Sequence, residues 1–228
     1  MVSFELWNQL LCQYVDSEGK VNYRAWKVES AQTLKQWLEE ISQINWNDTS
    51  SNHQLAMWLN LYNALVIDQI LEQYPIHSIR PTILGIPNWI VFVQFFQRKV
   101  IQIHHKSYSL NQIEHDTIRP LFRDSRVHFA LVCAARGCPL LRREAYQPEQ
   151  VQQQLEDDAW RFINNPQKVR YEPPVLYCSK IFKWYEKDFL QHHSSVADYI
   201  QQYLSVSLSN CKIRYLDYDW SLNQRTSS

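Results

Sequence analysis

The residues best suited to chemistry in this sequence lie between positions 126 and 139. An apolar run over residues 126–132 is predicted to be a β-strand, Cys133 follows it directly, and Cys138 precedes a proline. A cysteine attacks as its thiolate, so its pKa must fall from about 8.5 through a nearby base or positive charge. Cys133 is the candidate nucleophile, and Arg136 with the neighbouring turn amides would supply a positive field and an oxyanion hole. The alternative is a buried thiol that packs as a small hydrophobic residue.

Two histidines and a glutamate are candidates to serve this thiol. His115 lies on a predicted helix over residues 110–121, and packing of that helix on the strand would bring its imidazole to Cys133 as a general base. Glu114 lies on or beside the apolar stripe of this helix, where a buried carboxylate needs a partner. It would orient the imidazole, act as an acid or base itself, or pair with Arg119 or an amide.

His128 has a different position relative to the thiol. On a straight strand its Cα would lie roughly 16 Å from that of Cys133, and the two side chains would point to opposite faces. We therefore expect a hydrogen-bonded core histidine, or a residue on the substrate side of the site.

The spacing of cysteines and histidines does not indicate a metal site. Four residues separate Cys133 from Cys138, and no HExxH or His-x3-5-His pair accompanies them. We expect no metal and no cofactor. Cys138 is expected to be a structural turn residue, or a resolving thiol in a redox reaction. Five cysteines, an odd number with irregular spacing, favour free thiols in a reducing cytoplasm.

Composition excludes several classes of protein. Hydrophobic residues make up 45% of the 228, which suffices for a packed core. Lysine and arginine equal aspartate and glutamate at 23 each, so we expect no nucleic-acid partner. The sequence contains no glycine-rich phosphate-binding motif. Its start lacks the pattern of a signal peptide and no apolar run approaches ~20 residues, so we expect no membrane association.

The periodicity of hydrophobic residues predicts helices first and strands later. The helix over residues 53–74 is almost free of charge in its first half and is predicted to be central and buried. Asn60 and Asn63 share a face of it, so their amides must find partners in the core, bracing the site or lining its pocket. The remaining predictions are helices over residues 4–15, 30–44, 148–162, 183–190 and 196–204, a hairpin over 98–110, strands over 175–179 and 211–216, and buried loop and strand over 83–97.

These elements predict an α+β fold. We expect a single domain over residues 1–228, in which N-terminal helices and a mainly antiparallel sheet pack around the central buried helix. The sequence gives no indication of the oligomeric state.

Several blocks taken together resemble the domain-of-unknown-function 547 family. They cover about residues 50–223, so residues 1–49 would be a helical extension of the family-like core. The blocks are Trp58-Leu-Asn60-Leu-Tyr-Asn63, Ile113-Glu114-His115 with Arg119, Arg126-Val-His128 through Cys133 to Cys138-Pro139, Ser179-Lys-Ile-Phe-Lys-Trp-Tyr-Glu-Lys-Asp188-Phe, and Tyr218-Asp-Trp-Ser-Leu-Asn223.

The resemblance implies a single α+β domain distantly related to papain-like and transglutaminase-like thiol enzymes. It implies Cys133 as the nucleophile, His115 as the base, and Glu114 as the orienting residue or an independent acid. The glutamate and histidine precede the cysteine here, which is the reverse of papain-like enzymes and requires a permuted arrangement. Family members joined to glutaredoxin-like or thioredoxin-like modules imply small thiol-containing substrates besides peptides.

The leading hypothesis from the sequence is a cysteine-dependent hydrolase or acyl transferase that acts on an amide or peptide bond. The first alternative is a non-catalytic domain that binds a peptide or a small molecule. The second is a thiol redox protein that uses Cys133 and Cys138, although their spacing differs from the usual C-x-x-C.

Overall fold

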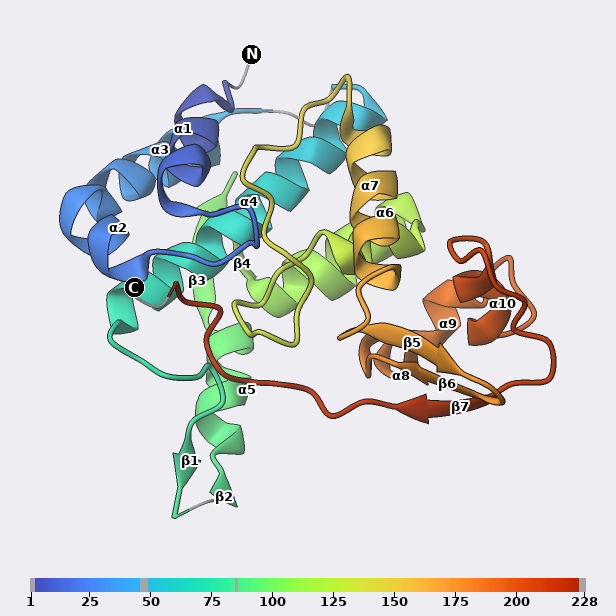
Figure 1. Ribbon diagram of the computed structural model, residues 1–228. Helices are drawn as coiled ribbons and strands as arrows, with labels where there is room; N and C mark the ends of the chain where they lie inside the picture. The colour runs from blue at the N-terminus through green and yellow to red at the C-terminus, as the bar shows by residue number, and fades with distance from the viewer. Residues whose placement is uncertain (1–2, 46–48, 85, 226–228) are drawn as a thin grey trace.

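The N-terminal part of the chain is helical, and three short helices pack beside a long fourth one (Figure 1). The computed structural model describes residues 3–45, 49–84 and 86–225. The helices predicted over residues 4–15, 30–44 and 53–74 are confirmed with small shifts of their ends, and a further helix lies between the first two. The four are α1 (Glu5–Tyr14), α2 (Tyr23–Glu29), α3 (Ala31–Gln43) and α4 (Ser51–Gln73).

Helix α4 is the centre of the fold, and most of its side chains are buried, as its sequence predicts. Ser50 caps its start by accepting a hydrogen bond from the His53 N–H at 3.3 Å. It ends before Pro75, which cannot continue a helix. Its large aliphatic side chains each contribute about 1.5–3 kcal/mol by leaving water. Within the described ranges, no helix combines the length and apolarity needed to span a bilayer.

The strands form separate small sheets in the described part of the chain, instead of one sheet. The pairs β1–β2, β3–β4 and β5–β6 are antiparallel, and β6–β7 is parallel. The hairpin predicted over residues 98–110 is confirmed as β3 and β4, and the α+β class is confirmed. The strands are β1 (Thr82–Ile83), β2 (Ile86–Pro87), β3 (Lys99–Ile103), β4 (Lys106–Ser109), β5 (Val169–Glu172), β6 (Val175–Cys178) and β7 (Lys212–Tyr215).

The strand predicted over residues 126–132 is wrong. A 3₁₀ helix, η2 (Ser125–Phe129), begins there because the Asp124 side chain accepts a backbone hydrogen bond at 2.9 Å. Beyond η2, the amide of Asn63 donates to one backbone C=O and accepts from one backbone N–H of this segment, both at 3.0 Å. One buried asparagine thus supplies partners that a neighbouring strand would otherwise supply. A buried apolar run therefore does not distinguish a strand from a coil braced by a side chain.

The charge-free run over residues 83–97, predicted as buried loop and strand, is largely a helix that projects from the body (Figure 1). Asn88 caps helix α5 (Trp89–Gln97) by accepting from the Val91 N–H at 3.2 Å. The hairpin of β1 and β2 extends beyond it, and we call β1, β2 and α5 together the arm. The absence of charged residues therefore does not indicate that this run is buried. Several of its large apolar side chains are exposed: Leu84, Ile86, Trp89, Ile90 and Val93.

The other helices are short, apart from α7, and most lie near the predicted positions. The helix predicted over residues 110–121 is a π-helix, η1, followed directly by α6, and Pro120 begins α6 instead of ending the helix. Their bounds are η1 (Gln112–Ile118), α6 (Arg119–Phe122), α7 (Val151–Ile163), α8 (Ile181–Trp184), α9 (Glu186–Phe189) and α10 (Val196–Gln201).

Two hydrophobic clusters form the core of the described chain. The larger surrounds α4 and includes α1 to α3, and the smaller lies among α7, α8, α9, α10 and the strands β5 to β7. Tyr218 packs against both clusters. After β7 the chain returns along the body to the N-terminal helices (Figure 1), and Leu222 pairs there with Ala135. This C-terminal segment ties the two clusters together.

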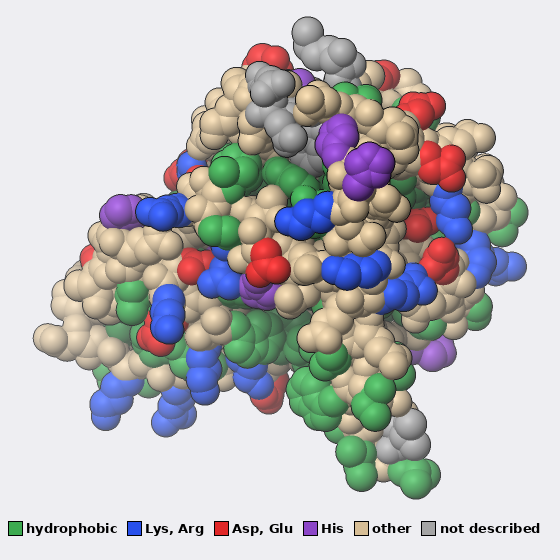
Figure 2. Space-filling view, turned by 180° about the vertical axis from the view of Figure 1, so that it is seen from behind, with side chains coloured by type: hydrophobic (Ala, Val, Ile, Leu, Met, Phe, Trp, Pro, Cys, Tyr) green, Lys and Arg blue, Asp and Glu red, His purple; other side chains and the backbone are tan. Residues whose placement is uncertain are grey.

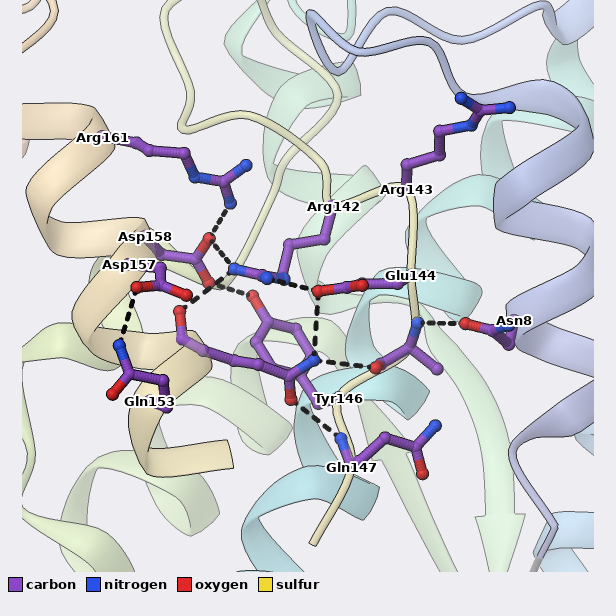
Figure 3. A network of polar contacts seen from close by, with 12 residues as sticks. Asn8, Arg142, Arg143, Glu144, Tyr146, Gln147, Gln153, Asp157, Asp158 and Arg161 are labelled. Carbon is purple, nitrogen blue, oxygen red and sulfur yellow. Dashed lines mark hydrogen bonds and ion pairs between the residues drawn. The ribbon is translucent and has the colours of Figure 1, made fainter. Parts of the chain in front are cut away.

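A buried ionic network holds the loop between Cys138 and α7 (Figure 3). Asp158 on α7 accepts hydrogen bonds from the Tyr146 hydroxyl at 2.7 Å and from Arg142 Nη1 at 2.9 Å, and it also pairs with Arg161. Burial raises the pKa of Asp158, although both arginines oppose the shift. Breaking such a buried network costs several kcal/mol, on the order of 3–5. The loop is therefore fixed where it leaves Cys138.

Candidate functional site

A cavity of about 480 Å³ opens where the two hydrophobic clusters meet. Its volume lies within the usual range of small-molecule sites. Four of the predicted site residues line it, although they come from different elements: Glu114, His115, His128 and Cys133. Most of the remaining lining is aromatic or aliphatic and comes from α5, α8 and the C-terminal segment. The structure thus brings the polar candidates together in one mostly apolar cavity.

The carboxylate of Glu114 is buried and fully partnered. Its Oε1 accepts a hydrogen bond from the Tyr185 hydroxyl at 2.6 Å, and its Oε2 accepts one from the Tyr62 hydroxyl at 3.3 Å. The predicted partners, Arg119 or an amide, are therefore replaced by two tyrosines. Burial raises the pKa of both tyrosines well above its ordinary value, and the charge of Glu114 adds to this. Both hydroxyls consequently stay protonated and donate.

A chain of hydrogen bonds joins the two histidines. Arg119 donates from Nη1 to His115 Nδ1 at 2.6 Å, and from Nε and Nη2 to the two carboxylate oxygens of Asp188 at 2.7 and 2.9 Å. His128 donates from Nε2 to Asp188 at 2.7 Å. A guanidinium can only donate, so Nδ1 of neutral His115 is an acceptor and its proton lies on Nε2. Glu114 Oε1 lies 3.9 Å from that Nε2, so Arg119 makes the hydrogen bond that holds this ring.

His128 is a buried, neutral imidazole on the cavity wall. Its ring stacks on Tyr185 with centroids 3.8 Å apart. Burial lowers the pKa of His128, although the hydrogen bond to Asp188 opposes the shift. With Nε2 donating to a carboxylate, Nδ1 is the basic nitrogen of the neutral ring. Both expectations for His128, a hydrogen-bonded core residue and a residue facing the site, are compatible with this position.

Asp188 is the ionised centre of this chain. Burial acts to raise the pKa of its carboxyl, but hydrogen bonds from His128 and Arg119 outweigh burial and hold the pKa below its usual range. The carboxylate fixes the orientation of the His128 ring directly and of the His115 ring through Arg119. It therefore positions both candidate bases.

Cys133 and Cys138 are joined by a disulfide, and their Cα atoms lie 6.2 Å apart. The expectation of free thiols is met by Cys12, Cys178 and Cys211 and is wrong for this pair. Cys138 is buried, whereas Cys133 is partly exposed in the cavity wall. The sequence could not show this pairing, because a separation of five residues is compatible with a reduced or an oxidised turn.

The sulfur atoms have two neighbouring hydrogen-bond donors. The Cys133 N–H donates to Cys138 Sγ at 3.0 Å, and the Tyr218 hydroxyl donates to the same sulfur at 3.1 Å. The Tyr218 oxygen also lies 3.5 Å from Cys133 Sγ. Burial raises the pKa of Tyr218, with a further contribution from Glu114, so this hydroxyl remains a donor.

Two backbone hydrogen bonds from the turn between the two cysteines hold it against the C-terminal segment. The N–H groups of Arg136 and Gly137 donate to the carbonyls of Ser221 and Asp219 at 2.8 and 2.7 Å. A Cβ on Gly137 would lie 2.8 Å from the Tyr218 ring, so only glycine permits this approach. Because these two amides already have carbonyl partners, they are not free to form the oxyanion hole expected from the sequence.

Lys168 places a positive charge against the turn, whereas the side chain of Arg136 is exposed and does not line the cavity. Lys168 Nζ donates to the Arg136 carbonyl at 2.6 Å. Burial lowers the pKa of this lysine to about 8. The ammonium is thus still mostly charged at neutral pH, and its hydrogen bond to the Arg136 carbonyl stabilises the turn.

Asn60 and Asn63 brace loops and do not line the cavity. Asn60 accepts from the Tyr146 N–H at 2.9 Å and donates to the Tyr146 carbonyl at 2.8 Å. Asn63 bonds the backbone just before Cys133, as described above. Both amides therefore find core partners, as their positions on α4 predict.

The site also contains residues that the sequence analysis did not single out for it, apart from Arg119, which it named only as a possible partner of Glu114. These are Tyr62, Arg119, Tyr185, Asp188 and Tyr218. All of them fall inside the sequence blocks that carry the family resemblance, which was the available signal. Within the described ranges, no group of three or more His, Cys, Asp and Glu side chains is arranged to hold a metal ion.

The comparison with protein families gives one finding. The chain belongs to the family described as protein of unknown function, DUF547, whose model matches residues 46–163, just over half of the chain. No curated protein matches the sequence, and no solved structure matches the fold. The relationship to papain-like enzymes stays a prediction.

Proposed function

We propose that this protein is a cysteine-dependent hydrolase or acyl transferase that acts on an amide or peptide bond. One observation carries the proposal: the Cys133 sulfur lies in the wall of a small-molecule-sized cavity that two histidines and a buried glutamate also line. Nucleophilic catalysis by a thiol needs a base, a group that orients the base, and a donor for the developing oxyanion. The cavity supplies side chains of all three kinds.

His128 is the more suitable base of the two histidines by its charge and its hydrogen bonding. A base must be neutral, and burial lowers the pKa of His128 so that its ring is neutral at physiological pH. Asp188 holds its Nε2 proton, which leaves Nδ1 to accept the thiol proton, in the manner of the aspartate of a catalytic triad. His115, the base that the family resemblance implies, has its Nδ1 occupied by Arg119. His115 then serves the leaving group or the substrate.

The reaction starts from the reduced enzyme. Cys133 Sγ forms a bond to the amide carbon, and its proton passes to the imidazole. The carbon–nitrogen bond breaks, and the amine leaves with that proton. Water, or an acceptor amine or thiol, then attacks the thioester, releases the acyl group and restores the Cys133 thiol. Tyr218 is the candidate donor to the oxyanion, because its hydroxyl lies 3.5 Å from Cys133 Sγ.

A thiol redox function is the second candidate, and the disulfide favours it. A substrate thiolate would attack the partly exposed Cys133 sulfur, form a mixed disulfide and release Cys138 as a thiolate. The Cys133 N–H and the Tyr218 hydroxyl would stabilise that leaving thiolate, since both donate to Cys138 Sγ. Exchange of this kind requires only the two sulfurs, however, and gives no role to the histidines and Glu114.

Single-cysteine variants separate the two functions. Hydrolysis of a fluorogenic N-acyl aminomethylcoumarin amide is measured under reducing conditions, next to reduction of a small disulfide. We expect Cys133→Ala to abolish hydrolysis and Cys138→Ala to retain it without a requirement for reductant. The matched control is Cys12→Ala, because Cys12 is an exposed free thiol outside the cavity.

Two results would overturn the hydrolase proposal. Hydrolysis by the Cys133→Ala variant would show that Cys133 is not the nucleophile. Disulfide reduction that is lost equally in Cys133→Ala and Cys138→Ala, with no amide hydrolysis in either or in the parent protein, selects the redox function.

The substrate is a peptide or another small amide, and the cytoplasm is the proposed location. A reducing compartment keeps the Cys133–Cys138 pair open, which the hydrolase reaction needs.

A further inference from the structure

Helix α5 contributes an unbroken apolar stripe to the cavity. Trp89, Phe92, Val93 and Phe96 all line it and follow the i, i+3, i+4, i+7 spacing of one helix face. At 1.5 Å per residue this stripe is about 10 Å long. The cavity wall is therefore elongated along the helix axis, and a long, narrow occupant fits it better than a compact one.

Aromatic rings form the wall that faces this stripe. The Trp184 and Tyr218 ring centroids lie 4.8 Å apart, and those of Tyr218 and Trp220 lie 4.5 Å apart. Trp220 in turn meets Phe92 of α5 edge to face at 5.0 Å. The rings thus form a continuous aromatic lining from Tyr218, which lies beside the cysteine pair, to α5. We call the part of the cavity that α5 and these rings line the apolar channel.

The charged and titratable side chains of the cavity lining are gathered around Tyr185. The ionisable groups of the lining, apart from the tyrosines and the disulfide, are Glu114, His115 and His128, and each of them lies against Tyr185. Residues 82–97 of the arm include no charged residue. Arg80 lies near the outer rim, but its guanidinium stacks on the rings of Trp89 and Trp220 at 5.3 and 4.7 Å. Apart from this guanidinium, the α5 side of the cavity offers no charged partner to a ligand.

The channel also lacks the polar partners that a peptide chain would require. A peptide presents an N–H and a C=O at each residue, and each needs a hydrogen-bond partner when it leaves water. Beside the ionisable groups, the polar side chains of the lining are Gln97, Asn111 and the indole N–H groups of three tryptophans, which can only donate, so few acceptors are available for a peptide N–H. A hydrocarbon chain needs no such partners, and its burial is favourable along the whole stripe.

The apolar surface continues from the channel onto the outside of the arm. Figure 2 shows hydrophobic side chains over the arm where it projects at the lower edge of the molecule. Ile90 is 71% exposed, Trp89 56% and Val93 42%. An amphiphilic molecule can therefore approach the cavity along an apolar surface before its chain enters.

We propose that the channel holds the aliphatic acyl chain of an N-acyl amide and thereby places its carbonyl carbon at Cys133. This inference rests on the proposed function and names the substrate class for the same site. The acyl chain lies against α5 and the aromatic rings, and the amide reaches the polar side chains around Tyr185. The amine side of the substrate points out of the channel and is not selected by it.

A series of N-acyl aminomethylcoumarin amides, from acetyl through butyryl and octanoyl to dodecanoyl, tests the inference. We expect kcat/KM to rise by about fourfold per methylene until the channel is filled, which follows from the burial of hydrocarbon. Each substrate is used below its critical micelle concentration. An equal kcat/KM across the series would overturn the inference and leave the proposed function intact.

A substitution inside the channel and a matched one outside it test the location. Val93→Trp shortens the channel and is expected to shift the chain length at which kcat/KM stops rising to a shorter acyl chain. Ile90→Trp makes the same change on the same helix, but Ile90 does not line the cavity, so the chain-length profile should stay as in the parent. The same shift in both variants, or in neither, would overturn the inference.

A binding measurement on Cys133→Ala separates the inference from catalysis. Titration with dodecanoate and with acetate is followed by tryptophan fluorescence, because Trp89, Trp184 and Trp220 line the channel. We expect saturable binding of dodecanoate, weakened at least about tenfold in Val93→Trp, and none of acetate. Dodecanoate binding together with absent hydrolysis in the parent protein would overturn the proposed function and support the acyl channel. Absence of dodecanoate binding would overturn the channel itself.

Discussion

The hydrogen bonds to Asp188 make Asp188→Asn the substitution with the most specific expected result. Three charge-assisted hydrogen bonds end on this carboxylate, two from Arg119 and one from His128. Each such bond contributes about 1.5–3 kcal/mol. Asparagine keeps one acceptor oxygen, and the side chains of Asp188 and Arg119 are 16% and 27% exposed, so water replaces part of the loss. We expect the free energy of unfolding to fall by about 2–4 kcal/mol at pH 7.

The pH dependence of this loss of stability follows from the lowered pKa of Asp188. The folded pKa lies below the ordinary value, which is about 3.9 in the unfolded chain. The stabilisation is therefore complete above this value and is lost as the pH falls through it toward the folded pKa. The difference between the parent and Asp188→Asn should accordingly be constant near neutrality and shrink in acid.

Urea unfolding at a series of pH values measures both effects. The control is Asp217→Asn, since Asp217 is fully exposed and pairs with Lys180 at the surface, where an ion pair contributes little. Equal unfolding free energies for the parent and Asp188→Asn at pH 7 would refute the reasoning. So would a loss that stays the same down to pH values well below 3.9.

Three further results are expected. Tyr185→Phe removes the shorter hydrogen bond to the buried Glu114 and should lower the unfolding free energy by about 1–2 kcal/mol, measured in urea. Gly137→Ala places a methyl group 2.8 Å from the Tyr218 ring, so it should lower the unfolding free energy by about 1–3 kcal/mol and change the near-ultraviolet circular dichroism. An unchanged spectrum and stability would contradict this contact. Burial lowers the pKa of His128, so the acid limb of a kcat/KM profile for amide hydrolysis should lie below about pH 6.5, and a limb above this value would exclude His128 as the base.

The central helix and the β3–β4 hairpin could be predicted because their signals are local and strong. The charge-free half of α4 has no solvent-facing side, so burial is the only favourable outcome. The two asparagines on it had to find partners, and they did so with loop backbone. The segment before Cys133 could not be assigned correctly, because its backbone is satisfied by a side chain that lies 69 residues earlier in the sequence.

Part of the cavity lining could be predicted from the sequence, but the hydrogen bonds that connect its residues could not. Glu114, His115, His128 and Cys133 line one cavity, as the sequence suggested they would if they acted together. The pairing of these groups depends on the position of Asp188 on α9, 69 residues after Arg119 in the sequence. Hydrophobic periodicity does not predict contacts between residues so far apart. The burial of the arm was predicted wrongly for a related reason. An apolar, uncharged run shows that a segment is hydrophobic, but its exposure depends on whether another element covers it.

The reactivity of the Cys133 sulfur tests the account most directly. The protein is reduced, and alkylation by iodoacetamide is followed at each cysteine by mass spectrometry across a pH series. The exposed Cys12 and the buried Cys178, whose pKa burial raises to about 12, serve as internal references. We predict that Cys133 is labelled faster than Cys12 and Cys178 near neutral pH, and that His128→Gln slows its labelling, because the neutral imidazole accepts the thiol proton. Labelling of Cys133 no faster than that of Cys12, or labelling that His128→Gln leaves unchanged, would contradict the account.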